Sequence, residues 1–184
     1  MKKENIQEFI DKLFELCRTS KGDAARLRHA DVPALAPRSW GSLARLGVYP
    51  DNWDLPECSC VAAAVAGLKD YQNGTLGLGT ALRLAYAEKR AAGDKEQADF
   101  KAPDGARLRR ILSCDTVEEL VRILRPMIKL IQSRGVGLDY ARLLGNLSRF
   151  RFNPEAVKQQ WATEFFRRGE KDNTADNTAQ GEAK

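Results

Sequence analysis

The sequence has little of what enzyme and metal sites need. Its 184 residues include a single histidine, His29, and four cysteines. Cys58 and Cys60 are separated by one residue, whereas roughly two to four residues separate the paired cysteines of common zinc sites, and a second ligand pair is missing. Glu118 and Glu119 are adjacent and so face different parts of a helix surface. The sequence predicts no enzyme, no metal and no cofactor, with the cysteines as buried, reduced thiols.

Long apolar runs are also missing. No stretch approaches the roughly 20 apolar residues that cross a bilayer as a helix. The first residues, MKKENIQEF, start basic but turn polar at once, so they lack the apolar centre of a secretion signal. We therefore expect a cytoplasmic protein without a membrane partner.

Signals for β-strands are weak, and apolar residues instead recur at helical spacing. We expect an all-α fold. Asn5 is expected to cap the first helix, Gly22 to end that region, and Pro126 to kink or divide a helix in the second half. Asp115 or Thr116 is expected to cap the helix that contains Pro126, and Asn153 the last helix. The expected helices cover residues 6–22, 23–30, 42–46, 57–68, 78–93, 107–113, 116–134, 139–150 and 154–166.

Composition suggests two small helical bundles. Residues 1–92 form the predicted N-terminal lobe and residues 104–168 the predicted C-terminal lobe, joined by a polar linker at 92–104. The last residues, 169–184, have no apolar anchor and are predicted to be a disordered tail.

The positive charge is concentrated in the second half of the chain. Residues 1–100 carry 14 basic and 14 acidic side chains, whereas residues 101–168 carry 14 basic and 7 acidic ones, a net charge of +7. The tail carries 2 basic and 4 acidic side chains. Such asymmetry indicates a polyanion as partner, although a solvated helical face with surplus arginine would have the same composition.

Three predicted helices place cations opposite their apolar stripes. The guanidinium group is planar and permanently charged, which suits phosphate oxygens. These faces hold few acidic residues, so we expect them to contact a nucleic-acid backbone. The cations are Arg107, Arg109 and Arg110 in the first helix, Arg122 and Lys129 in the second, and Arg142 and Arg149 in the third.

Two further patterns have a structural interpretation and a functional one. Trp161 and Phe165 are spaced for core packing beside Val157, although aromatic rings can also stack on bases, and Phe166 faces elsewhere, where it could meet a protein partner. The segment Leu76–Gly79 reads LGLG, but it lacks the Gly-Lys-Ser/Thr ending of a phosphate loop and is predicted to be a tight turn before a helix.

Five segments form a recognisable order along the chain. They are GDAARLRHA at 22–30, LGLGTAL at 76–82, RLRRIL at 107–112, GLDYARLL at 137–144 and WATEFF at 161–166. Taken together they resemble the CasB family, the small subunit of the type I-E CRISPR surveillance complex, Cascade. The resemblance covers roughly residues 6–168. His29 stands where the family's first motif has a second arginine, and Gly137 where the family often has proline.

The resemblance implies an all-α protein of two bundles that works without catalysis. Its partners would be the other Cascade subunits with their guide RNA, a second copy of itself, and target DNA, chiefly the displaced single strand of the R-loop. The residues that it implies for nucleic-acid binding are Arg26, Arg28, Arg107, Arg109, Arg110 and Arg142. Arg122, Lys129 and Arg149 are added from the helical faces alone.

Two other functions remain to be separated from this one. A helical adaptor would use the same basic face to bind an acidic protein. A helix-turn-helix regulator would need polar base-reading residues on a compact helix pair, and the sequence has no such pair.

Overall fold

The structure, a computed structural model, describes residues 3–87 and 103–167. It confirms the all-α prediction, since these residues form nine α-helices and one short 3-10 helix. The predicted tail at 169–184 and most of the predicted linker at 92–104 lie outside the described residues. The helices are α1 (Lys3–Thr19), α2 (Lys21–Leu27), η1 (Ala36–Ser39), α3 (Trp40–Ala44), α4 (Leu55–Ala66), α5 (Leu78–Ala87), α6 (Pro103–Leu112), α7 (Val117–Ser133), α8 (Tyr140–Phe150) and α9 (Pro154–Phe166).

The boundary between the first two helices differs from the prediction. Asn5 lies inside α1 rather than at its cap, and Gly22 lies inside α2 rather than at a helix end. The residue that begins α2 is Ser20, whose hydroxyl accepts a hydrogen bond of 3.2 Å from the amide of Asp23. A serine in this position satisfies an amide that the first helical turn leaves without a partner, and this outweighs the low helix propensity of Gly22.

Two predicted caps are confirmed, because Thr116 and Asn153 accept a hydrogen bond from an amide in the first turn of α7 and α9. Asp139, which was expected inside the next helix, instead caps α8 in the same way. Gly135 follows α7 with a φ of 68°, the left-handed conformation that glycine tolerates.

Of the two predicted effects of Pro126, a kink or a division of the helix, the division is wrong. The helix runs from Val117 to Ser133. A proline cannot donate to the carbonyl four residues earlier, here that of Arg122. Pro126 and Arg122 are both exposed, so water can bond to the carbonyl that proline leaves free.

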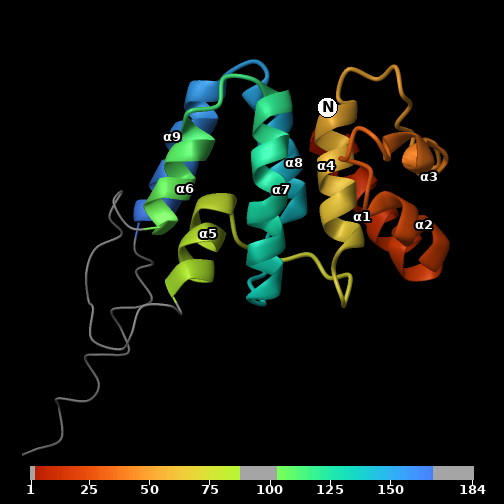
Figure 1. Ribbon diagram of the computed structural model, residues 1–184, viewed down its shortest axis with the longest axis horizontal. Helices are drawn as coiled ribbons and strands as arrows, with labels where there is room; N and C mark the ends of the chain where they lie inside the picture. Colours follow the sequence, from red (N-terminus) through yellow and green to blue (C-terminus); the bar gives the residue numbers. More distant parts are fainter. Residues whose placement is uncertain (1–2, 88–102, 168–184) are drawn as a thin grey trace, which may run out of the picture.

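The helices α7 and α8 lie between two groups (Figure 1). On one side, α4 packs against both of them and α1 packs against α8, with α2 and α3 farther out. On the other side, α5 packs against α6 and α9. Helix α5 belongs by sequence to the predicted N-terminal lobe, yet its main contacts are with the C-terminal helices. The buried residues of both groups form one continuous core, and no helix in the described part is long and apolar enough to cross a membrane.

All four cysteines are buried thiols, as predicted. Burial raises the pKa of Cys17 and of Cys114 to about 11 and that of Cys60 to about 12. Because the thiolate is the reactive form, a pKa raised by about two units lowers its population about 100-fold.

We expect native labelling by a disulfide reagent to be at least about 100-fold slower than for a free thiol, with all four thiols reacting in denaturant. A thiol that reacts at the free rate in the native protein would contradict the buried arrangement.

Candidate nucleic-acid interface

Helix α6 holds three of the predicted cations. Leu108 and Ile111 are fully buried, so the neighbouring positions face outward. Arg109 and Arg110 are exposed, and no carboxylate among the described residues pairs with them. Arg107 differs, since its guanidinium carbon lies 4.8 Å from the ring centre of Tyr86 on α5. A cation over an aromatic face is attracted by the ring quadrupole, so Arg107 also connects α6 to α5.

Helix α7 presents Arg122 and Lys129 to solvent, because Leu124 and Ile128 of the same helix are buried. Neither cation has a carboxylate partner among residues 3–87 and 103–167. Arg125, which lies between them, is ion-paired with the carboxylate of Asp31. The α7 face therefore offers two cations rather than three.

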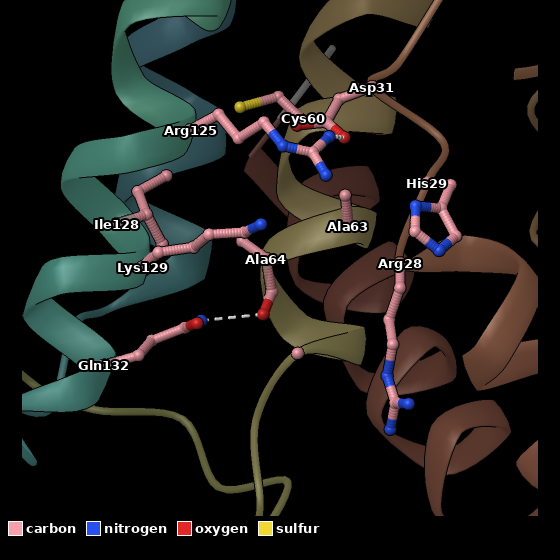
Figure 2. Close-up of a pocket in the computed structure, with 11 residues that line it drawn as sticks. Arg28, His29, Asp31, Cys60, Ala63, Ala64, Arg125, Ile128, Lys129 and Gln132 are labelled. Carbon is pink, nitrogen blue, oxygen red and sulfur yellow. Dashed lines mark hydrogen bonds and ion pairs between the residues drawn. The ribbon is translucent and has the colours of Figure 1, made fainter. Parts of the chain in front are cut away.

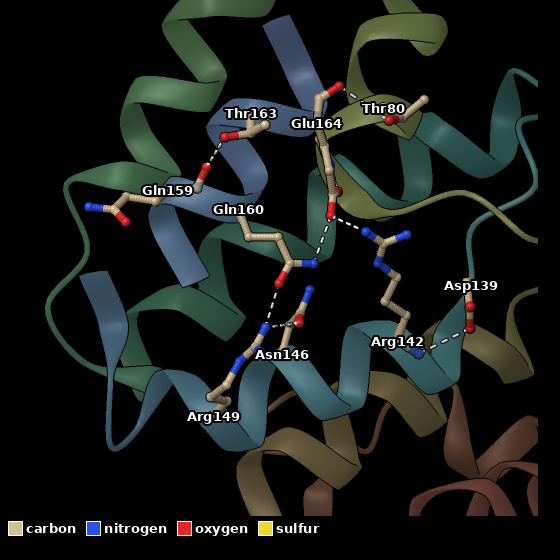
Figure 3. A network of polar contacts seen from close by, with 10 residues as sticks. Thr80, Asp139, Arg142, Asn146, Arg149, Gln159, Gln160, Thr163 and Glu164 are labelled. Atoms are coloured by element: carbon tan, nitrogen blue, oxygen red, sulfur yellow. Dashed lines mark hydrogen bonds and ion pairs between the residues drawn. The ribbon is translucent and has the colours of Figure 1, made fainter. Parts of the chain in front are cut away.

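Helix α8 uses its two predicted cations to join α9, as Figure 3 shows. The Arg142 Nη2 atom lies 2.6 Å from Glu164 Oε1, and Gln160 donates to the same oxygen at 2.8 Å. Arg149 donates to the side-chain oxygens of Asn146, at 2.8 Å, and of Gln160. Arg142 and Arg149 thus lie in one network, and both already have partners on the protein.

This network predicts a structural role for Arg142. Glu164 is 11% exposed, so removal of Arg142 leaves a largely buried carboxylate with one partner fewer. We expect Arg142→Gln to lower the free energy of unfolding by about 1 kcal/mol, a value limited by the partial exposure of the arginine. The matched control is Arg110→Gln, which removes an exposed cation that pairs with no described carboxylate and should change the free energy of unfolding by less than about 0.5 kcal/mol. Equal effects in chemical denaturation would contradict this role.

Helix α2 and its end supply the remaining two predicted cations. Arg26 is exposed and lies 3.5 Å from the carboxylate of Asp23. That carboxylate also accepts a hydrogen bond of 2.7 Å from Ser42 and pairs with Arg45 at 2.6 Å. Hydrogen bonds from Ser20 and Ser42 lower the pKa of Asp23. Arg26 is therefore one of several groups that neutralise one buried anion.

Arg28 lies just after α2, where its Nε atom donates to the carbonyl of Ala66 at 2.9 Å. It lines a cavity opposite Lys129, and Figure 2 shows both side chains. The structure thus brings together one residue implied by the family motif and one taken from the α7 face.

The nine predicted residues fall into two classes. Five are engaged by other groups of the chain: Arg26, Arg28, Arg107, Arg142 and Arg149. Four are exposed and without a carboxylate partner in the described part of the chain, and we call them the α6–α7 cations: Arg109, Arg110, Arg122 and Lys129. Because α6 and α7 pack against each other, these four charges lie on neighbouring helices, and each can donate charge-assisted hydrogen bonds to a phosphate.

The sequence did not reveal an exposed aromatic pair near the end of α8. Trp53 and Phe152 are 51% and 75% exposed, and their ring centres are 5.9 Å apart. The guanidinium of Arg151 lies 5.7 Å from the Trp53 ring while it pairs with the fully buried carboxylate of Glu57 at 3.0 Å. Trp161 and Phe165 are fully buried, which confirms the core assignment, and Phe166 is 38% exposed.

Comparisons with known proteins agree with one another. The model of the family described as CRISPR-associated protein Cse2 matches residues 23–166, whereas no curated protein matches the sequence. Among solved structures, a chain of a CRISPR RNA-guided surveillance complex has a TM-score of 0.69 at 19% identity, over 97% of this chain and 99% of that chain. A Cse2-family protein from Thermus thermophilus has a TM-score of 0.65 at 24% identity, over 88% and 97%. CasB from Thermobifida fusca has a TM-score of 0.61 at 19% identity, over 90% and 97%.

The structural likenesses, all below 25% identity, show the fold. The family match is of another kind, because it rests on sequence and extends from α2 to the last residue of α9. It includes both helices that hold the α6–α7 cations and all five of the predicted residues that other groups engage. This chain belongs to the Cse2 family of CRISPR-associated proteins.

Proposed function

We propose that this chain is the non-catalytic small subunit of a type I-E Cascade complex and holds the displaced DNA strand of the R-loop by its backbone. The observation that carries the proposal is the set of α6–α7 cations, which are exposed and not neutralised by carboxylates in the described part of the chain. The family match and the likeness to a chain of a CRISPR RNA-guided surveillance complex support the assembly.

The proposed role follows from the energetics of strand exchange. A guide–target duplex is about as stable as the DNA duplex that it replaces, so R-loop formation is nearly balanced. A protein that binds the displaced strand through phosphates shifts this balance without reading sequence. Side chains such as Arg109 and Lys129 supply charge and donors for this purpose, and they act alike on any target.

The proposed partners follow from the same role. They are the other Cascade subunits with their guide RNA, the displaced strand of the target DNA, and a second copy of this chain within the complex. A cytoplasmic location is proposed with them, since that is where a guide-loaded complex meets invading DNA.

Binding of short single-stranded DNA by the purified chain at two salt concentrations tests the nucleic-acid half of the proposal. We expect weak binding without sequence preference that falls steeply as salt rises, because released counterions drive the association. Footprinting of both target strands, with the chain added to a guide-loaded complex that lacks it, tests the second half. Protection should extend along the displaced strand.

The same experiments separate the proposal from an adaptor that binds an acidic protein. An adaptor would join the complex without protecting DNA and would leave R-loop lifetime unchanged. Strong preference for one duplex sequence would instead indicate a regulator, and either result would overturn the proposed role.

A further inference from the structure

A small cavity opens between α4 and α7, and we call it the α4–α7 cavity (Figure 2). Its volume is about 180 Å³. Ala63 and Ala64 of α4 form one wall and Ile128 of α7 forms the facing wall. The alanines leave space opposite Ile128, and the polar side chains of His29 and Gln132 also line the cavity. The space is therefore suited to a flat, weakly polar group.

The polar groups lie around these walls. Lys129 reaches from α7 toward Ala63 and Ala64, and Arg28 lies on the far side of the cavity. Arg125, which also lines the cavity, is ion-paired with Asp31, whose side chain is 5% exposed. Burial raises the pKa of Asp31, although Arg125 opposes this.

The net charge of the cavity is positive. Arg28, Arg125 and Lys129 contribute three positive charges, against a single carboxylate from Asp31. Since Asp31 is already paired with Arg125, Arg28 and Lys129 are the cations left for an anion at the rim. One cavity thus combines apolar walls with two cations that no described carboxylate pairs with.

The volume of the α4–α7 cavity fits one six-membered aromatic ring. An apolar cavity of about 150 Å³ in a protein core is enough to bind benzene, and a pyrimidine base is a single six-membered ring with small substituents. Unstacked bases of single strands are bound in this way by proteins that also hold the adjoining phosphates. The combination of apolar walls and cationic rim matches one nucleotide unit, with its ring inside and its phosphate at the rim.

We propose that the α4–α7 cavity receives one unstacked pyrimidine of a bound nucleic-acid strand while Arg28 and Lys129 hold a neighbouring phosphate. The inference rests on the proposed function, to which it adds a fixed point along the strand. A strand held by phosphates alone can slide, whereas a base in a cavity sets its position.

Photocrosslinking tests the location directly. An oligothymidine with one 5-iodouracil is bound to the full chain, irradiated and mapped by mass spectrometry. We expect the crosslink in peptides that contain residues 28–31, 60–67 or 125–132, which line the cavity. A crosslink confined to peptides outside these segments would overturn the proposal, and this measurement needs no variant.

A substitution that fills the cavity tests whether base binding requires its space. Ala63→Leu should weaken oligothymidine binding about tenfold, which corresponds to about 1.4 kcal/mol, while the affinity for an abasic strand of equal length and charge stays unchanged. The matched control is Ala156→Leu on the exposed face of α9, which should change neither affinity. If a folded Ala63→Leu variant keeps both the crosslink and the preference for bases, the cavity does not hold the base.

A second variant pair keeps the test valid if Ala63→Leu does not fold. Lys129→Gln removes an exposed charge at the rim and should reduce the crosslink severalfold, whereas Lys21→Gln, an exposed lysine of α2 outside the cavity, should not. Equal crosslinking by both variants would count against the rim contact.

Two further measurements distinguish a free nucleotide from a strand, and a failure of this proposal from a failure of the proposed function. If thymidine monophosphate competes with oligothymidine at concentrations too low for non-specific binding, the cavity binds a free nucleotide, and the proposal that it binds a strand is overturned. Equal, salt-dependent binding of oligothymidine and the abasic strand would overturn the cavity proposal but leave the proposed function standing. Loss of all single-strand binding would overturn the proposed function itself.

Discussion

Replacing Gly79 with alanine is expected to lower the free energy of unfolding by about 3 kcal/mol, because α5 and α9 approach each other too closely for a methyl group. A Cβ atom at Gly79 would lie 2.1 Å from the backbone carbonyl oxygen of Trp161 and 2.9 Å from the amide nitrogen of Phe165. Backbone atoms cannot turn aside as a side chain can, so the two helices must separate.

The separation would also disturb a hydrogen bond. The Gly79 amide donates to Glu164 Oε2 at 3.1 Å, and Glu164 connects α9 to Arg142 of α8. The substitution therefore acts on three helices through one contact. Thermal or chemical unfolding monitored by circular dichroism measures the loss.

Gly22→Ala is the matched control. Gly22 also lies inside a helix, but a Cβ atom there meets nothing within 4 Å. Alanine has the higher helix propensity, so this variant should be more stable by about 0.5–1 kcal/mol. If both variants change the free energy of unfolding in the same direction by similar amounts, α5 and α9 do not approach each other closely at Gly79.

The contrast between these glycines shows what the sequence contains and what it does not. Periodicity predicted the buried stripe of Val157, Trp161 and Phe165 because a stripe repeats within one helix. The sequence also predicted the caps at Thr116 and Asn153, whose partners lie three residues away. The partner of Gly79 lies on a helix about eighty residues later, and no local pattern records that distance. The sequence predicted a helix that starts at Leu78, as α5 does, but it did not predict that α9 lies against Gly79.

The candidate interface also has a part that the sequence predicts and a part that depends on the tertiary structure. Arg109, Arg110 and Arg122 are exposed because buried neighbours on their own helices turn them outward, which periodicity can predict. Arg142 was assigned to nucleic acid by the same reasoning, but its ion pair with Glu164 depends on how α8 meets α9. Whether a side chain points outward depends on its own helix alone. Whether it finds a carboxylate partner depends on how the helices pack.

Reversal of the four α6–α7 cations is expected to have the largest effect on function. The variant carries Arg109→Glu, Arg110→Glu, Arg122→Glu and Lys129→Glu. Each lost phosphate contact should reduce the logarithmic salt slope on a single strand by about 0.7, so four contacts reduce it by about 3. If each exposed contact contributes about 0.5–1 kcal/mol, affinity falls about 100-fold, and the introduced carboxylates add repulsion.

The control for this variant has the same change in net charge at other exposed sites. It reverses Lys12, Lys21, Arg38 and Lys69, all exposed and all in the first half of the chain. Among them, Lys12 is ion-paired with Glu8, but both side chains are largely exposed and such pairs contribute little to stability. Both variants should melt near the parent temperature, because surface substitutions usually change stability by less than about 0.5 kcal/mol each.

R-loop lifetime in the assembled complex distinguishes local contacts from the overall charge. With the α6–α7 variant the guide still pairs with its target, but the displaced strand loses its phosphate contacts and competes more effectively for re-pairing. R-loops should then dissociate faster for every target sequence, because the lost contacts read no bases.

With the control, long-range attraction is reduced equally, yet charges beyond the Debye length of about 8 Å are screened at physiological salt. Its R-loops should therefore last nearly as long as those of the parent. Equal lifetimes for both variants and the parent would show that the displaced strand is held elsewhere, whereas equal losses would show that net charge alone is responsible.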